Sequence, residues 1–252
     1  MLKRILLVNC LFTLAFICKG QENIDSLKKI LTTKISGDSS KADLLNQIAK
    51  AYQATDANMT IEYASQAKTI SEKINYKKGL AIALKMKGVG HYFLGHYLET
   101  VEDWEKAHIY FDSIGDRSNV SKILSNLGAV YTTNGDEAKS LEYYLRSLKV
   151  AEEIQDNVGI LSAQNNIGVL YMIKQSTYDK ALQYFQSALQ LSEKINDKQN
   201  TGNASVNLGE LYFSMGDPNK ALYYYNKSLE ALLQLRPRTH RDRFCDWDED
   251  YR

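Results

Sequence analysis

The sequence holds very few of the residues that break helices or cross-link small folds. Only two prolines occur in 252 residues, Pro218 and Pro237. This scarcity suits a nearly all-helical chain, because proline interrupts helix interiors. Of the three cysteines, Cys10 and Cys18 lie in the first twenty residues. If that segment is removed on export, Cys245 stands alone and an internal disulfide is excluded.

Patterns typical of catalysis and metal binding are also absent. The chain has no Gly-x-Ser-x-Gly elbow for a nucleophile and no glycine-rich phosphate loop. His91 and His96 are five residues apart, which does not place two metal ligands on one helix face. We interpret His91 as a packed side chain and the other histidines of the repeats as solvated. The sequence therefore predicts no catalytic residue, no metal, no cofactor and no enzymatic activity.

The first twenty residues have the pattern of a secretory signal. Lys3 and Arg4 precede a short apolar stretch over 5–18, and small residues favour cleavage before Gln21. The stretch is short for a membrane span. An uncleaved anchor and a lipid attached at Cys18 are the alternatives. We expect export to the periplasm or cell envelope.

The charge of the chain shows no strong bias of either sign. Removing the signal leaves 28 basic and 30 acidic residues. Binding to nucleic acid or to an anionic membrane needs a basic face. The balance therefore argues against both as the main partner.

What the sequence does contain is a repeated phrase. Asn126-Leu-Gly-Ala-Val-Tyr131 returns at 166–171 and 207–212, and the central glycines are spaced by 40 and 41 residues. Each period carries two apolar stripes of helical spacing with a turn between them, such as Asn134-Gly-Asp136. A fixed period of this length is typical of a solenoid. The sequence predicts an all-α fold, an α-solenoid of stacked antiparallel helix–turn–helix hairpins.

Aspartates recur where one hairpin ends and the next begins. Asp116, Asp156 and Asp197 each follow an isoleucine by two residues, and Tyr76 holds the corresponding place earlier in the chain. Aspartate side chains accept hydrogen bonds from the exposed amides of a first helical turn. We therefore predict that these three aspartates cap the helices that follow them.

The motif within each period resembles the tetratricopeptide repeat. Leu-Gly-x2-Tyr occurs in the first helix, and the second helix carries a small residue followed four positions later by an aromatic one. The pairs are Thr100 with Trp104, Ser140 with Tyr144, Ala181 with Phe185, and Ala221 with Tyr225. The period of 40 rather than 34 is similar to a long-helix variety, in particular the exported repeat regions of Bacteroidetes signalling proteins. We expect the aromatic side chain to fill the space between hairpins.

The signal pattern, the repeats and the composition together divide the chain into four segments. They are a signal peptide at 1–20, a leading helix and turn at 21–40, an array at 41–235 with repeats at 41–75, 81–114, 121–154, 161–195 and 202–235, and an irregular tail at 236–252. The fourth repeat holds one extra residue in a Gln-Ser-Thr turn. No lysine follows Lys227, whereas five of the eight arginines lie in the tail. We interpret the tail as a linker or as the product of a shifted reading frame, in a gene that is truncated or has lost a downstream domain.

In tetratricopeptide arrays the first helices line the concave face, and the resemblance places a column of amides there. An amide offers both a donor and an acceptor to a peptide backbone. The alternative is that the asparagines bond to neighbouring helices and only set the stacking. We expect this groove to be apolar and amide-rich rather than basic. The predicted peptide-binding residues are Gln47, Asn126, Asn166 and Asn207 in the column, with Lys85, Tyr92, Lys122 and Thr133 beside it.

Two functions follow from these patterns. The first is a non-catalytic interaction module of the cell envelope that binds a protein or peptide partner in its groove, with no nucleic acid and no small-molecule substrate. The second is a truncated sensory region of a membrane signalling protein, such as a histidine kinase, whose output domain is missing. In that case a missing carboxyl-terminal segment or an uncleaved amino terminus would tether it to the membrane. An enzyme that uses the array as a scaffold has no support among these residues.

Overall fold

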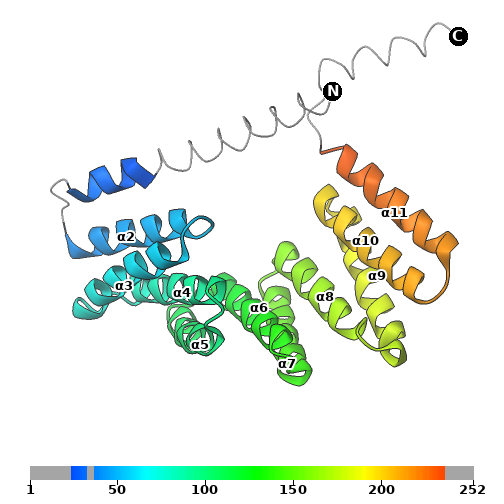
Figure 1. Ribbon diagram of the computed structural model, residues 1–252, viewed down its shortest axis with the longest axis horizontal. Helices are drawn as coiled ribbons and strands as arrows, with labels where there is room; N and C mark the ends of the chain where they lie inside the picture. Colours follow the sequence, from blue (N-terminus) through cyan, green and yellow to red (C-terminus); the bar gives the residue numbers. More distant parts are fainter. Residues whose placement is uncertain (1–23, 33–36, 236–252) are drawn as a thin grey trace, which may run out of the picture. The chain divides into compact units, whose positions relative to one another are not determined.

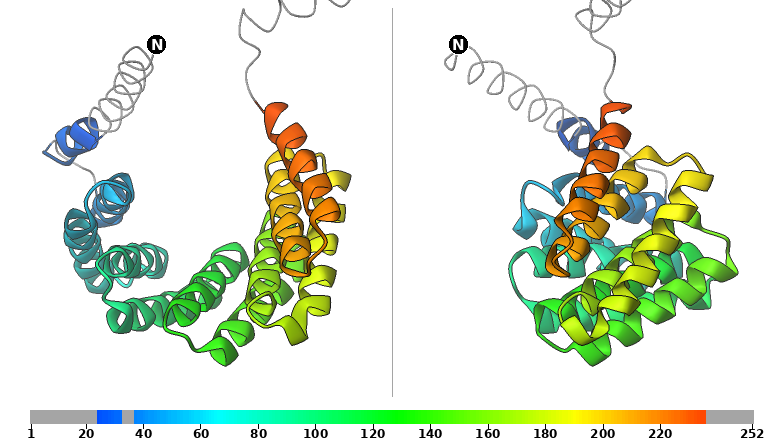
Figure 2. Two further views of the ribbon diagram at one scale, coloured as in Figure 1. Left: turned by 45° about the vertical axis from the view of Figure 1, so that its right-hand side comes forward. Right: turned by 90° about the vertical axis from the view of Figure 1, so that its right-hand side faces the viewer.

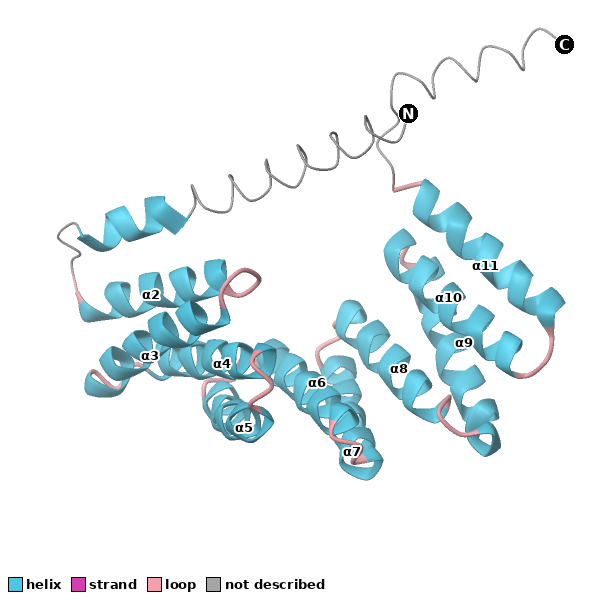
Figure 3. Ribbon diagram, viewed as in Figure 1, coloured by secondary structure: helices cyan, strands magenta, loops and turns pink. Residues whose placement is uncertain are grey.

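The computed structural model describes residues 24–32 and 37–235. The predicted signal segment at 1–20 and the predicted tail at 236–252 lie outside the described residues. All regular structure in the described residues is helical, and short turns join the helices without any strand (Figure 3). This confirms the predicted all-α fold class.

The helices fall into two compact units, divided between Asn134 and Gly135. The division lies in the turn of the third predicted repeat (Figure 1). Unit 1 contains a helical segment at 24–32, followed by α2 (Asp38–Tyr52), α3 (Ala57–Lys73), α4 (Lys77–Phe93), α5 (Tyr97–Ser113) and α6 (Arg117–Thr133). Unit 2 contains α7 (Glu137–Glu153), α8 (Asn157–Tyr171), the short 3-10 helix η1 (Gln175–Thr177), α9 (Tyr178–Lys194), α10 (Lys198–Ser214) and α11 (Pro218–Leu233).

Within each unit, helices that follow one another in the chain pack side by side as hairpins (Figure 2). Neighbouring hairpins also touch through their first helices, since α2 contacts α4 in unit 1 and α8 contacts α10 in unit 2. Each hairpin thus buries the apolar stripe that it cannot bury alone. This stacking confirms the predicted solenoid of helical hairpins.

The glycines of the repeated phrase allow each hairpin to close. A Cβ atom added at Gly88 would lie 2.3 Å from the Trp104 ring, and one at Gly168 would lie 2.4 Å from the Phe185 ring. Both distances are far below van der Waals contact, so only glycine fits. The aromatic residue therefore packs against the glycine of its own hairpin. In unit 2 Phe185 also belongs to an apolar cluster with Ala204 and Leu208 of the next hairpin, as expected for a side chain that fills the space between hairpins.

The predicted aspartate caps are confirmed. The side chains of Asp116, Asp156 and Asp197 accept hydrogen bonds of 3.0–3.1 Å from the amides three residues later. Asp56, Asp136 and Asp217 cap α3, α7 and α11 in the same way, although the spacing argument did not single them out. Each cap satisfies an amide that the first turn of a helix leaves unpaired.

The start of the array differs from the expected boundaries. The leading segment is helical over 24–32, but the expected turn at Gly37–Ser40 is mostly helix, since α2 begins at Asp38. Gly37 has a φ of 96°, and of the four residues expected to form the turn it alone lies outside α2. Asp38, Ser39 and Ser40 suit a first helical turn, where short polar side chains are favoured. The extra residue of the fourth repeat falls in the region of η1, after α8 has ended early at Tyr171.

None of the described helices combines the length and the apolar character needed to cross a bilayer.

Candidate functional site

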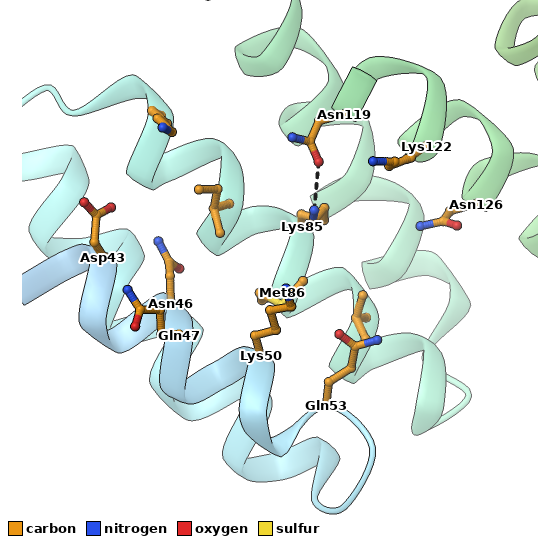
Figure 4. A pocket seen from close by; sticks show the side chains of 13 residues that line it. Asp43, Asn46, Gln47, Lys50, Gln53, Lys85, Met86, Asn119, Lys122 and Asn126 are labelled. Atoms are coloured by element: carbon orange, nitrogen blue, oxygen red, sulfur yellow. Dashed lines mark hydrogen bonds between the residues drawn. The ribbon is translucent and has the colours of Figure 1, made fainter. Parts of the chain in front are cut away.

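Unit 1 contains a cavity of about 610 Å³ on the face formed by its first helices. Its lining residues all come from α2, α4, α6 and the residue that ends α2, and none comes from the second helices α3 and α5. Figure 4 shows these side chains extending from the three helices toward a common space. The lining residues are Asp43, Asn46, Gln47, Lys50, Gln53, Lys78, Ile82, Lys85, Met86, Val89, Asn119, Lys122 and Asn126.

Four of the predicted site residues meet in this cavity. They are Gln47 from α2, Lys85 from α4, and Lys122 and Asn126 from α6. Lys50, Lys78, Asn46 and Asn119 also line the cavity, although they were not among the predicted site residues. Helical spacing from the predicted residues would have found two of them, since Lys50 is three positions after Gln47 and Asn119 three before Lys122.

The lining is more basic than expected. It includes four lysines, Lys50, Lys78, Lys85 and Lys122, against the single carboxylate of Asp43. Asp43 already accepts a hydrogen bond from the Tyr76 hydroxyl at 3.0 Å. The lining is amide-rich as expected, but the expectation that it would not be basic was wrong for unit 1. The four lysines are spread along the sequence, on α2, α4 and α6, so their clustering is visible only in the folded chain.

Lys85 is fixed in place by a chain of hydrogen bonds. Its Nζ donates to Asn119 Oδ1 at 2.8 Å, and Asn119 Nδ2 donates to Asp116 Oδ2 at 2.8 Å. Asp116 is itself the cap of α6, so the capping residue also orients the amide that holds the lysine. Burial, together with the charges of Lys122 and Lys50, lowers the pKa of Lys85, while the carboxylate of Asp116 acts in the opposite direction.

Asn46 is the most buried polar side chain of the cavity lining, with 4% of its surface exposed. Its Nδ2 donates to the Gly79 carbonyl at 3.0 Å, which fixes the orientation of the amide. Its Oδ1 is buried and accepts no hydrogen bond from the described residues. A buried acceptor without a donor costs free energy on the order of 1–3 kcal/mol. A ligand N–H group would remove this cost.

The predicted amide column continues in unit 2 with a different role. Asn207 Nδ2 donates to Asn165 Oδ1 at 3.0 Å, which joins the first helices α10 and α8. Asn207 therefore behaves as the alternative interpretation expected, by contributing to stacking. Asn166 is half-buried in α8. Exposed apolar side chains lie on the same two helices, including Val169 at 42% and Phe213 at 68% exposed.

Tyr92 and Thr133 do not reach the cavity. The Tyr92 ring stacks on Trp104 with 6.0 Å between ring centroids. Thr133 is exposed, and its hydroxyl donates to the Ala129 carbonyl of its own helix at 3.0 Å. These two residues flank the predicted column in sequence, but neither is among the cavity residues.

The histidine interpretation can be compared with the structure in the α4–α5 hairpin. The His91 side chain is only 16% exposed and lies 3.7 Å from Asp103, whereas His96 is exposed. Lys87 also approaches Asp103, with 3.2 Å between Nζ and Oδ2. Burial is the main cause that lowers the pKa of His91. In the described residues, no group of three or more His, Cys, Asp or Glu side chains is arranged to hold a metal ion.

Comparison with known proteins places the repeats in one family. Models of the tetratricopeptide repeat match residues 120–154 and 159–234. The Photosystem I assembly protein Ycf3 of Rippkaea orientalis is 36% identical over 77 residues, which is 31% of this chain and 39% of that protein. The chain thus spans well under half the length of this curated relative.

Solved structures share the fold at low sequence identity. BtubC (BKLC) from P. vanneervenii superposes with a TM-score of 0.71 and 17% identity, covering 88% of this chain and 94% of its own. A Rap protein complexed with Competence and Sporulation Factor superposes with a TM-score of 0.62 and 14% identity, covering 80% and 66%. The family models therefore support a tetratricopeptide repeat protein, and the solved structures show that its fold is shared.

Proposed function

We propose that this protein is a non-catalytic interaction module of the cell envelope that holds an extended peptide segment of a partner protein. The observation that carries this proposal is the cavity of unit 1. It is built only from first helices, and it presents amides and ammonium groups side by side. Amides such as Gln47 and Asn126 can pair with a peptide backbone without reading its sequence.

The similar proteins support a protein partner. The Rap structure was solved with Competence and Sporulation Factor, and Ycf3 is named as an assembly protein. The proposed envelope location rests on the signal-like pattern at 1–20. Separation of cell compartments, followed by detection of the protein, tests the location independently of binding.

The binding test uses the chain without residues 1–20 and a displayed library of twelve-residue peptides. We expect enriched peptides to lose about tenfold or more in affinity when Gln47, Gln53 and Asn126 of the cavity lining are all changed to alanine, because each amide supplies hydrogen bonds of about 0.5–1.5 kcal/mol. A matched control changes Gln66, Gln186 and Gln190, which lie on the second helices α3 and α9, to alanine. Circular dichroism should show the same helicity in both variants. Equal affinities for both variants would contradict binding through the first helices.

A second function, the sensory region of a membrane signalling protein, is favoured by the surface of α11. Leu222 and Leu229 are 59% and 57% exposed. Their counterparts in α9, Leu182 and Leu189, lie in an apolar cluster with Ala204 and Leu208 of α10. A further helical element could cover α11 in the same way. Reading the gene beyond codon 235 in all frames tests this function, which requires an apolar span and a downstream output domain there.

A further inference from the structure

Unit 1 contains a second cavity, of about 530 Å³, which we call the α3–α5 cavity. Its walls come from the second helices α3 and α5 and from Lys77, Leu80 and Leu84 of α4. It shares no lining residue with the cavity of the first helices, to which α3 and α5 contribute nothing. A ligand of the α3–α5 cavity can therefore be tested separately from the proposed peptide binding.

Much of the lining of the α3–α5 cavity is apolar. Leu80 and Leu84 are only 6% and 1% exposed, and Tyr110 is half-buried. Ile109 adds to this apolar surface and is 63% exposed. Cavities that bind small organic molecules are typically about 300–1,000 Å³ in volume, with apolar walls and a few well-placed polar groups. The α3–α5 cavity has this size and this character.

Ile109 stands at a position that is polar in the later repeats. When the second helices are aligned on the small residue nine positions earlier in each, the counterparts of Ile109 are Lys149, Gln190 and Glu230. The stacking of the hairpins thus does not require an apolar residue here. Because this exposed isoleucine lies in the wall of an apolar cavity, it differs from a lone exposed side chain and indicates a contact with a ligand.

Two ammonium groups border this apolar surface. Lys77 and Lys106 line the cavity, and neither forms an ion pair within residues 24–32 and 37–235. The one carboxylate of the lining, Glu72, is paired with Lys68 at 2.8 Å. The cavity therefore attracts a ligand that combines an apolar body with a negative charge.

Unit 2 has a cavity at the equivalent place, with a volume of about 310 Å³. Each of its lining residues stands 121 positions after a residue that lines the α3–α5 cavity, which is also the distance from Gly88 to Gly209. The two cavities are thus formed by corresponding helices of the repeat, α3, α4 and α5 in unit 1 and α9, α10 and α11 in unit 2. A difference in their chemistry comes from the side chains and not from the fold.

The unit 2 cavity neutralises its own lysine. Lys227 of α11 pairs with Glu193 of α9 at 2.7 Å, so the ion pair joins two walls of that cavity. The counterparts of these residues in unit 1 are Lys106 and Glu72. Leu189 stands in unit 2 in place of the lysine that engages Glu72, so Glu193 has no competing lysine one turn before it. Lys106 therefore lacks the carboxylate that its counterpart has.

These observations lead us to propose that the α3–α5 cavity binds a small amphipathic carboxylate, a linear fatty acid of medium chain length. Its carboxylate binds Lys106, as Glu193 binds Lys227 in unit 2, and its alkyl chain covers Ile109 and Tyr110. Covering these side chains removes apolar surface from water, which favours binding roughly in proportion to the area buried. This site is additional to the proposed function and does not depend on it.

The test titrates the full chain with three ligands in a calorimeter, each below the concentration at which it forms micelles or separates from water. Decanoate is the expected ligand, decanol has the same chain without the charge, and butyrate has the carboxylate with a short chain. Lys106→Gln removes the ammonium group, and Ile109→Glu introduces the residue of the equivalent position in α11. The matched controls, Lys149→Gln in α7 and Val158→Glu in α8, make the same kinds of change at exposed positions outside the cavity.

We expect decanoate to bind at least ~10-fold more tightly than decanol, because charge-assisted hydrogen bonds are stronger than neutral ones. Butyrate should bind at least ~100-fold more weakly than decanoate, because it buries much less apolar surface. Lys106→Gln should remove the preference for decanoate and leave the affinity for decanol unchanged. Ile109→Glu should weaken binding of both by ~10-fold or more, because it places a charge against the alkyl chain. The two controls should leave all three affinities unchanged.

Equal binding of decanoate and decanol by the natural protein, or no binding of decanoate, would overturn the proposal. It would also be overturned if Lys106→Gln changed the affinities no more than Lys149→Gln, since the ligand would then bind elsewhere. Because Lys106 and Ile109 are exposed, the variants should keep melting temperatures close to that of the natural protein. If Ile109→Glu does not fold, Ile109→Gln, which copies Gln190 of α9, takes its place in the test.

Two other occupants with related chemistry are outcomes of the same test. An acidic amphipathic helix of a partner protein is represented by a helical peptide of leucine, glutamate and alanine, and an anionic membrane surface by phosphatidylglycerol vesicles. Binding of either probe that is lost in both Lys106→Gln and Ile109→Glu, without binding of decanoate, would overturn the assignment of the cavity to a free fatty acid.

Discussion

The α4–α5 hairpin of unit 1 and the α8–α9 hairpin of unit 2 share one glycine–aromatic contact but differ in the side chains that surround it. Gly88 against Trp104 and Gly168 against Phe185 form the same close contact in the two hairpins. When the hairpins are aligned on these glycines, three neighbouring positions differ in chemistry. Unit 1 has Lys87, His91 and Asp103 where unit 2 has Ile167, Tyr171 and Tyr184.

In unit 2 these positions are apolar or aromatic. Ile167 is fully buried, and the rings of Tyr171 and Tyr184 stack with 5.9 Å between centroids. In unit 1 the same place holds a largely buried carboxylate between a lysine and a histidine. The fold therefore accepts either chemistry at this position, provided that the glycine and the large aromatic residue are kept.

The surfaces formed by the first helices also differ between the units, and again unit 1 is the more polar and charged. Unit 1 presents lysines and free amides around a cavity. Unit 2 joins its first helices through Asn207 and Asn165 and exposes apolar side chains such as Phe213. The comparison indicates that the repeats are equivalent as structural units but not as binding surfaces.

Removing the shared aromatic residues should have the largest effect. Trp104→Ala and Phe185→Ala each delete a large buried ring, and we expect each to lower the free energy of unfolding by about 3–5 kcal/mol. Amide hydrogen exchange resolved by helix should show faster exchange in α4 and α5 for the first variant and in α8 and α9 for the second. If one of the two variants loses less than ~1 kcal/mol of unfolding free energy, the glycine–aromatic contacts of the two hairpins are not equivalent.

Exchanging the three differing residues should change the free energy of unfolding by a smaller amount. The change should be destabilising when only one residue is exchanged, and neutral or stabilising when all three are. Asp103→Tyr alone leaves Lys87 without its carboxylate, and we expect a loss of about 2–4 kcal/mol in unfolding free energy. Lys87→Ile, His91→Tyr and Asp103→Tyr together recreate the unit 2 arrangement. This triple variant should be as stable as the natural protein or up to about 4 kcal/mol more stable. Urea unfolding measures both, and a triple variant less stable than the single one would break the comparison.

The smallest of the three expected effects is a difference between the two hairpins in how their stability depends on pH. Burial, which is the largest cause, and Lys87 and His96 lower the pKa of His91, while Asp103 and Glu99 act in the opposite direction. Because the folded state disfavours the protonated ring, this contribution to stability is present above the unfolded pKa of about 6.5 and is lost as the pH falls through the lower folded value. Hydrogen exchange in α4 and α5 should therefore speed up on acidification.

His91→Tyr is the variant that checks this pH dependence. It places the unit 2 residue at this position and should remove the part of the acid sensitivity that comes from the histidine. Exchange in α8 and α9, where tyrosines occupy the equivalent places, serves as the internal reference. An unchanged pH profile in the variant would rule out His91 as its source.

Much of this arrangement was predictable, and the reasons lie in particular residues. The glycines spaced by 40 and 41 residues predicted the hairpins because only glycine fits beneath Trp104 and Phe185. Asp116 was predictable as a cap because a side chain that bonds to the adjacent turn depends only on local sequence. Its second role, orienting Asn119 toward Lys85, was not predictable because it joins two helices.

The sequence by itself determined the all-α repeat fold and the aspartate caps, since each depends on a short spacing along the chain. Only the tertiary structure decided which polar side chains meet. Lys50, Lys85 and Lys122 lie in three different helices, and their convergence on one cavity depends on the rotation of each helix about its axis. That rotation is fixed by packing between hairpins. The same packing paired Asn207 with Asn165 and left Asn46 Oδ1 without a donor in the described residues.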